Sequence, residues 1–269
     1  MAQKTPSTRF HDGIALHYDE EYLHPFWLLY QDISWEIIKK YLGFVPKGGL
    51  VLDAGGGTGY WSRKLASVGY LVYCVDLSEG MLRVGVQKSV EAGLKERISF
   101  VQADILELCF PDETFSLVFC EGDPVSYCGD PQKAVQELAR VAKNGAIVTV
   151  SVDSFYQAIR RMVVNRDFRE LEMLIRTHQT VYRGDFLQHN FTPSELRELF
   201  QKCGLEVLGL YGKPVFAQSI FWGEMDLYLG DEEYREKLLE IELLWNSEGS
   251  LVGFGGHLEI IGRKVTPGC

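Results

Sequence analysis

The chain has 269 residues, of which 46% are hydrophobic and 24% are charged. These are the proportions of a globular protein, and they exclude a largely disordered chain. Acidic residues outnumber basic residues by 37 to 27, which gives a net charge of −10 and disfavours a large interface with nucleic acid. No apolar run approaches the roughly 18 residues that a membrane-spanning helix needs. We therefore expect a cytoplasmic protein that binds neither nucleic acid nor a membrane.

The six cysteines do not follow a metal-binding pattern, because none belongs to a CxxC pair and none lies near an HxxxH segment. A chain of this length can also bury enough apolar surface without disulfide bonds. We expect no bound metal and no disulfide framework, which favours a reducing compartment.

An aromatic-rich segment opens the chain, and apolar residues at helical spacing between Ile33 and Leu42 predict a helix that ends at Gly43. Beyond it, short apolar runs alternate with helical patterns. The predicted strands are 50–52, 71–75, 98–101, 115–120, 146–152, 205–210 and 258–261, and the helices among them are 61–68, 81–92, 131–143 and 193–203. This alternation predicts an α/β fold with a doubly wound, mostly parallel sheet of seven strands.

Two segments interrupt the alternation, a mixed helical one over 155–190 and another over 214–252. No Pro/Gly/Ser-rich linker separates either of them from the rest. We therefore expect a single domain, 1–269, with a helical and aromatic cover over the carboxyl ends of the strands. The core is predicted to comprise 43–154, 191–213 and 253–265, and the cover 8–42, 155–190 and 214–252.

A glycine-rich turn follows the first predicted strand. The strand ends in Asp53, and Gly55, Gly56, Gly57 and Gly59 come before the next helix. Glycines at this position let the backbone approach a ligand closely. In open α/β sheets, ligands bind outside the carboxyl ends of the strands, which is where this turn is expected.

The pattern Asp53-x-Gly55-x-Gly57-x-Gly59 resembles motif I of the class I S-adenosylmethionine (SAM)-dependent methyltransferases. The resemblance implies SAM as the cofactor and an antiparallel last strand. It is reinforced at the ends of the next strands. Asp76 would accept hydrogen bonds from the ribose hydroxyls, and Asp104 would bind the adenine amino group.

The resemblance also implies a full set of cofactor contacts. Tyr18, in a Tyr-Asp segment typical of small-molecule members of the family, would help to cover the cofactor. The predicted cofactor-binding residues are Tyr18, Asp53, Ala54, Gly55, Gly57, Gly59, Asp76, Leu77, Met81, Asp104, Ile105 and Glu121. Leu77 and Met81 would pack near the adenine, and Glu121 would lie at the methionine end.

The methyl acceptor is less strongly indicated. The segment Asp123-Pro124-Val125-Ser126 departs from the Asn/Asp-Pro-Pro-aromatic motif of many enzymes that methylate amino groups of nucleic acid or protein. Together with the net charge, this departure favours a small-molecule acceptor. The acceptor atom and the oligomeric state stay open.

No catalytic residue is assigned by the sequence. An activated sulfonium methyl group requires mainly alignment and exclusion of water. Candidate proton acceptors are His11, His24, His178, His189 and His257. His189 is the first candidate because it precedes a helix start, and Tyr18 is the second. Two alternatives remain, aminopropyl transfer on the same fold and a regulatory module that binds SAM without turnover.

Overall fold

The computed structural model describes residues 5–183 and 185–265. Its centre is a seven-stranded sheet in the order β3-β2-β1-β4-β5-β9-β8. The strands are β1 (Leu50–Ala54), β2 (Leu71–Asp76), β3 (Ile98–Gln102), β4 (Phe115–Cys120), β5 (Ala142–Asp153), β8 (Leu205–Lys213) and β9 (His257–Lys264). Only β9 runs antiparallel to its neighbours. The predicted fold class is therefore confirmed, including the antiparallel last strand.

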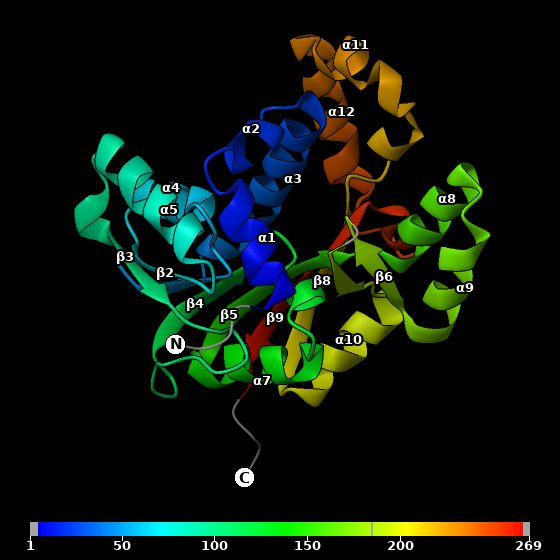
Figure 1. Ribbon diagram of the computed structural model, residues 1–269. Helices are drawn as coiled ribbons and strands as arrows, with labels where there is room; N and C mark the ends of the chain where they lie inside the picture. Colours follow the sequence, from blue (N-terminus) through cyan, green and yellow to red (C-terminus); the bar gives the residue numbers. More distant parts are fainter. Residues whose placement is uncertain (1–4, 184, 266–269) are drawn as a thin grey trace.

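Helices cover both faces of the sheet (Figure 1). On one face lie α3 (Pro25–Leu42), α4 (Tyr60–Ser67) and α5 (Glu79–Glu91), which bury Ile33, Leu65 and Leu82 against the strands. On the other face lie α7 (Pro131–Val141) and α10 (Pro193–Lys202), which contribute Leu138 and Leu196 to a second apolar core. This two-sided burial accounts for the nearly continuous apolar runs of the central strands.

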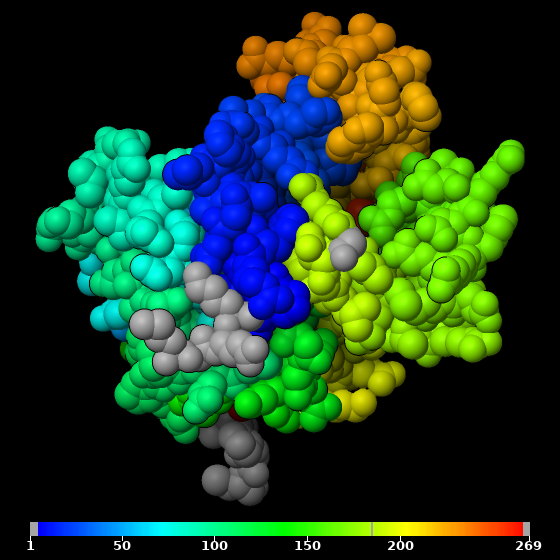
Figure 2. Space-filling model, viewed as in Figure 1, coloured from blue at the N-terminus to red at the C-terminus, as the bar shows by residue number. Residues whose placement is uncertain are grey.

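The remaining elements form a cover. They are α1 (Pro6–Ile14), α2 (Tyr18–Glu21), α6 (Pro124–Tyr127), α8 (Phe155–Asn165), α9 (Phe168–Thr177), α11 (Met225–Leu229) and α12 (Glu232–Trp245), with a hairpin of β6 (Gln179–Tyr182) and β7 (Phe186–His189). Figure 2 shows the N-terminal segment, in blue, lying across one face between α4–α5 and the hairpin.

The mixed helical segment predicted over 155–190 contains two helices, α8 and α9, and a β-hairpin that was not predicted from the sequence. The residues of the hairpin alternate with a period of two, since Thr180 and Gln188 are buried while Val181 and Leu187 are exposed. The buried positions include polar residues and the exposed ones are apolar, so the usual strand pattern is inverted.

No helix among the described residues is both long and apolar enough to cross a bilayer. Five cysteines, Cys74, Cys109, Cys120, Cys128 and Cys203, are free thiols. Cys269 lies outside the described residues.

A buried lysine joins four elements under α3. Lys213, at the end of β8, donates to Glu121 and Glu259 at 2.6 Å each and to Ser34 of α3 at 2.9 Å. The three charged side chains are completely buried. Burial disfavours the ammonium ion, but the two carboxylates hold the pKa of Lys213 above its ordinary value.

We predict that Lys213→Met lowers the free energy of unfolding by about 3–5 kcal/mol, because it leaves two buried carboxylates without their cation. Lys237→Met is the control, since this side chain is two-thirds exposed and forms a surface ion pair with Glu240. Chemical denaturation of both variants is the measurement. A Lys213→Met protein as stable as the parent would contradict the assignment.

Candidate functional site

The sequence-predicted strand-end residues converge at one edge of the sheet. Two cavities open there, of about 330 and 730 Å³. Tyr18, Gly55, Gly57 and Gly122 line both of them. The glycine turn after β1 therefore forms a wall shared by the two cavities.

The conformation of the turn explains its glycines. Gly55, Gly57 and Gly59 all have positive φ angles, of 71°, 55° and 74°, in the left-handed region that disfavours other residues. The amide groups of Gly55 and Gly56 donate to the carbonyl of Val75 at 2.7 and 2.9 Å, which fixes the turn against β2. A Cβ atom at Gly57 would meet no other atom within 4 Å, so the requirement at Gly57 is conformational.

The smaller cavity brings together most of the predicted cofactor contacts. These are Tyr18, Gly55, Gly57, Asp76, Leu77, Met81, Asp104 and Ile105. Both oxygens of Asp76 face backbone donors, with Gly57 N at 2.9 Å and Ser78 N at 2.8 Å. Burial raises the pKa of Asp76, although these two hydrogen bonds oppose the shift. Each carboxylate oxygen keeps a lone pair for a ligand hydroxyl.

The larger cavity contains the predicted residue at the end of β4. Glu121 and Tyr30 both line it. One carboxylate oxygen of Glu121 binds Lys213, while Oε1 is buried and has no hydrogen-bond partner among the described residues. This oxygen is therefore available to a ligand donor.

Three predicted contacts lie outside the lining of both cavities. Asp53 and Ala54 are completely buried behind the turn, and Gly59 is the N-cap residue of α4. Asp53 accepts a hydrogen bond of 2.6 Å from Ser62, while its Oδ1 has no partner in the described part of the chain. Burial raises the pKa of Asp53 to about 7.

Two acids attach the cover to the segments that follow β1 and β2. Asp12 of α1 accepts from Ser78 Oγ at 2.6 Å and from Gly80 N at 2.9 Å. Asp19 of α2 accepts from Thr58 Oγ1 at 2.6 Å and pairs with Lys88. These contacts position Tyr18, between the two acids in the chain, against both cavities.

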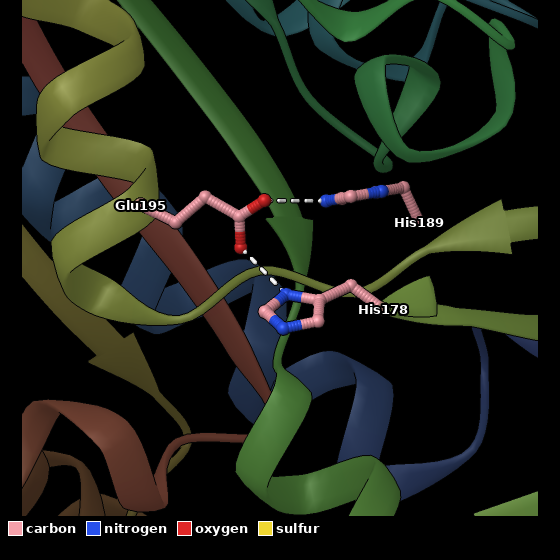
Figure 3. Close-up of side chains that lie close together, drawn as sticks. All are labelled: His178, His189 and Glu195. Atoms are coloured by element: carbon pink, nitrogen blue, oxygen red, sulfur yellow. Dashed lines mark hydrogen bonds and ion pairs between the residues drawn. The ribbon is translucent and has the colours of Figure 1, made fainter. Parts of the chain in front are cut away.

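The candidate His189 is held away from the cavities. Its Nε2 lies 2.8 Å from Glu195 Oε1, and His178 Nδ1 lies 2.9 Å from Glu195 Oε2 (Figure 3). Glu195 also completes the capping box that begins α10 at Thr192. These contacts with Glu195 connect the hairpin to α10. His189 is not among the residues that line either of the two cavities.

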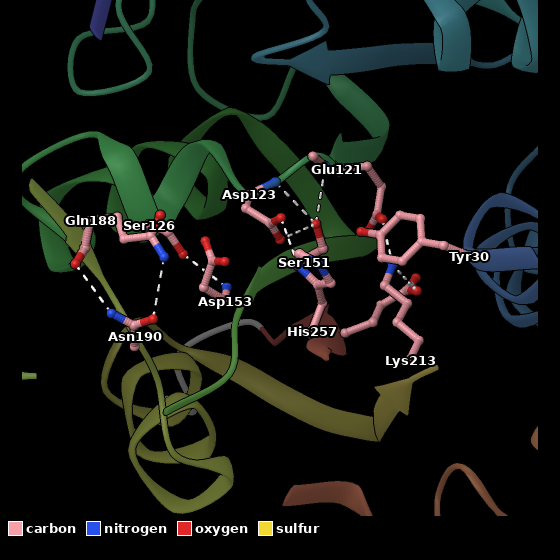
Figure 4. A network of polar contacts seen from close by, with 12 residues as sticks. Tyr30, Glu121, Asp123, Ser126, Ser151, Asp153, Gln188, Asn190, Lys213 and His257 are labelled. Atoms are coloured by element: carbon pink, nitrogen blue, oxygen red, sulfur yellow. Dashed lines mark hydrogen bonds and ion pairs between the residues drawn. The ribbon is translucent and has the colours of Figure 1, made fainter. Parts of the chain in front are cut away.

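Sequence reasoning did not single out the acids at the ends of β4 and β5. Asp123 and Asp153 lie with His257 in a network of polar contacts (Figure 4). His257 Nδ1 lies 2.8 Å from Asp123 Oδ2, and both side chains are almost buried. His257 was one of five candidate histidines, but nothing in the sequence ranks it above the others.

Residues 51–145 match the family model described as a methyltransferase domain. A demethylmenaquinone methyltransferase of Clavibacter sepedonicus is 38% identical over 103 residues, which are 38% of this chain and 40% of that protein. The chain thus spans about 40% of the length of this relative. A tRNA 5-carboxymethoxyuridine methyltransferase of Escherichia coli strain K12 is 24% identical over 246 residues, or 88% of each protein.

The fold is similar to the crystal structure of a SAM-dependent methyltransferase from Methanosarcina mazei, with a TM-score of 0.62 and 19% identity. That alignment covers 86% of this chain and 98% of the other. Residues 51–145 thus form a methyltransferase domain, and the fold is that of the class I SAM-dependent methyltransferases.

The residues that line the cavities fit the cofactor of this methyltransferase family. Leu77, Met81 and Ile105 offer an apolar surface for an adenine ring. A Cβ atom at Gly122 would meet no other atom within 4 Å, so the space beside it is open. The unpartnered oxygen of Glu121 suits an ammonium group such as that of methionine.

We predict that the stability of Asp53→Asn decreases less than that of the parent protein as the pH rises. The folded protein keeps a proton on Asp53 up to about pH 7, whereas an unfolded chain releases it near its ordinary pKa of roughly 4. The free energy of unfolding therefore decreases as the pH rises through this interval. Asparagine has no titratable proton, so the variant does not lose this stability.

Melting curves at pH 5 and pH 8 test this prediction. The stability of Asp53→Asn relative to the parent should increase by roughly 2–3 kcal/mol between these pH values. Asp185→Asn, at an exposed position of the hairpin turn, should show no such change. An Asp53→Asn protein that follows the parent at both pH values would refute the assignment.

Proposed function

We propose that this protein transfers a methyl group from SAM to a small-molecule acceptor in the cytoplasm. The observation that carries the proposal is the smaller cavity, where Asp76 and Asp104 face the same space as the glycine turn. Acids at successive strand ends, beside a turn of glycines, are the arrangement that a nucleoside with a short charged tail requires.

In this proposal each part of the cavity edge has one role. Asp76 binds the ribose hydroxyls, and Asp104 with the amide of Ile105 binds the adenine edge. Asp104 Oδ1 already accepts from Leu106 N at 2.9 Å, which orients the carboxylate. Glu121 binds the ammonium group at the methionine end. When bound, SAM supplies a methyl group that its sulfonium has already activated.

The remaining predicted residues exclude water from the cavities or support the glycine turn. Tyr18 donates to or accepts from Tyr22 at 3.0 Å, and the pair belongs to the cover that keeps water from the cavities. Asp53, Ala54 and Gly59 hold the turn from behind. Exclusion of water matters because a methyl transfer depends on alignment and on an undisturbed nucleophile.

A small acceptor is favoured over a nucleic acid by the charge of the chain. The similarity to a tRNA methyltransferase extends over most of both proteins, which makes a tRNA nucleotide the second candidate. However, the net charge is −10, and a phosphate backbone needs clustered basic residues. Release of S-adenosylhomocysteine in the presence of a metabolite panel, compared with total tRNA, separates the two candidates and also tests for a module without turnover.

We predict that Asp76→Ala weakens binding of S-adenosylhomocysteine by roughly 30- to 1000-fold. A carboxylate can accept two hydrogen bonds from a ribose diol, each contributing about 1.5–3 kcal/mol, and two bonds to one group do not add fully. Calorimetric titration is the measurement, with NAD as the comparison cofactor, which should not bind.

The control is Asp112→Ala, whose side chain is about three-quarters exposed and forms a surface ion pair with Arg140. It should change the affinity less than about twofold. Thermal melting of both variants without ligand shows whether the fold is intact. Parent-like affinity in Asp76→Ala would disprove the ribose assignment.

A further inference from the structure

Two acids and a histidine form a cluster beside the proposed cofactor site, and none of the three has a role in that site. Asp123 follows β4, Asp153 ends β5, and His257 begins β9. One ligand-type atom from each lies within 4.8 Å of the other two. In the sheet, Asp153 pairs in register with His257, so their side chains lie on the same face, the one that α3 covers.

Asp153 is the member of this cluster that has a carboxylate oxygen without a hydrogen-bond partner among the described residues. Asp123 is satisfied on both oxygens, since Oδ1 accepts from Ser151 Oγ at 2.9 Å and Oδ2 faces His257. The Oδ2 atom of Asp153 is buried without a hydrogen-bond partner among the described residues, and so is Gln188 Oε1 of the hairpin. Both atoms can accept hydrogen bonds and neither can donate one, provided Asp153 is ionised.

The network around Asp153 contains more acids than cations. Its acidic members are Glu121, Asp123, Glu259 and the partly buried Asp153, and its cationic members are Lys213 and the partly buried His257. Burial, and then the charge of Asp123, raises the pKa of Asp153 to about 7, although His257 and the exposed Arg161 of α8 oppose the shift. A positively charged ligand would relieve this excess of negative charge.

Aromatic side chains lie near the cluster. Tyr127 and Tyr182 have ring centroids 5.4 Å apart, and the charge of Asp153 adds to burial in raising the pKa of both hydroxyls. On the other side, the rings of Trp27 and Tyr30 lie 5.8 and 5.0 Å from that of His257. Aromatic faces attract organic cations and repel anions.

The cluster adjoins the cofactor cavities through the segment after β4. Gly122, next to Asp123, lines both cavities, and Tyr127 lines the smaller one. Figure 2 also shows a recess between the hairpin, α8 and the segment of α11, with atoms of the C-terminal part of the chain, in red, at its base. A ligand at Asp153 would thus lie next to the cofactor rather than in its place.

We propose that the methyl acceptor is a primary or secondary organic amine, which enters as an ammonium ion and binds Asp153 between the aromatic side chains. This inference rests on the proposed methyl transfer and names its substrate class. The aromatic side chains favour an organic cation over a metal ion, because rings offer a metal no ligand.

Asp153 also accepts the proton that the ammonium group of the substrate must lose. An ammonium nitrogen has no lone pair, so it must first lose a proton, which the carboxylate of Asp153 accepts. The amine lone pair then forms the new C–N bond as the C–S bond of the sulfonium breaks. The products are a methylated ammonium ion and S-adenosylhomocysteine, and Asp153 returns its proton to water as the product leaves. Asp123 fixes His257 through Nδ1 and has a positioning role.

The test uses the full chain saturated with S-adenosylhomocysteine and three probes of one shape. Phenethylamine is cationic, 2-phenylethanol is neutral, and 3-phenylpropanoate is anionic. We expect phenethylamine to bind at least about tenfold more tightly than the other two by calorimetry. Asp153→Asn should abolish this preference and keep the affinity for S-adenosylhomocysteine.

Asp185→Asn is the matched control, since it removes an exposed carboxylate from the hairpin turn, and it should retain the preference. Tyr182→Leu is a second variant, which keeps Asp153, and it should weaken the binding of phenethylamine by a factor of about 2–30. Equal binding of the three probes, or a preference that persists in Asp153→Asn, overturns the inference. Absence of S-adenosylhomocysteine binding would instead refute the proposed function, so the two failures are distinguishable.

Discussion

The buried ammonium group of Lys213 determines how the half of the sheet beyond β4 is built. Two acids, Glu121 directly after β4 and Glu259 on β9, lie inside the protein, and each would be strongly destabilising without a cation. Lys213 reaches both from β8 and also binds Ser34 of α3. Strands that are far apart in the sequence are therefore joined to one another and to the helix above them.

This arrangement keeps polar groups at the edge where the strands end. Lys213 occupies one oxygen of Glu121, which lines the larger cavity, and the other oxygen is buried without a hydrogen-bond partner among the described residues. The glycine turn separates this cavity from the smaller one, and the cover closes over both through Asp12 and Asp19. The sheet thus supplies fixed polar groups, and the N-terminal helices supply the enclosure that a water-sensitive transfer needs.

Much of the sheet and the glycine turn could be predicted from the sequence, because their determinants are local. Buried parallel strands are short apolar runs, and the turn after β1 requires glycine at left-handed positions such as Gly55 and Gly57. The positions of Asp76 and Asp104 could be predicted for the same reason, since Asp76 ends β2 and Asp104 lies two residues after β3. The family resemblance added the roles of these residues, which remain to be tested.

The rest depends on contacts between distant residues. His257 lies more than a hundred residues from Asp123 in the chain, and a lone histidine gives no sign of its partner. The hairpin was missed because Thr180 and Gln188, which are polar, occupy its buried positions. His189 was favoured as a candidate because it precedes a helix start, but that same helix supplies Glu195, which binds it.

The central claim is that the strand ends hold SAM, and a crystal structure of the complex with S-adenosylhomocysteine tests it most directly. The account predicts the adenine among Leu77, Met81 and Ile105, the ribose hydroxyls on Asp76, and the methionine ammonium group near Glu121. An adenosine bound outside the smaller cavity, or a ribose without contact to Asp76, would contradict the account.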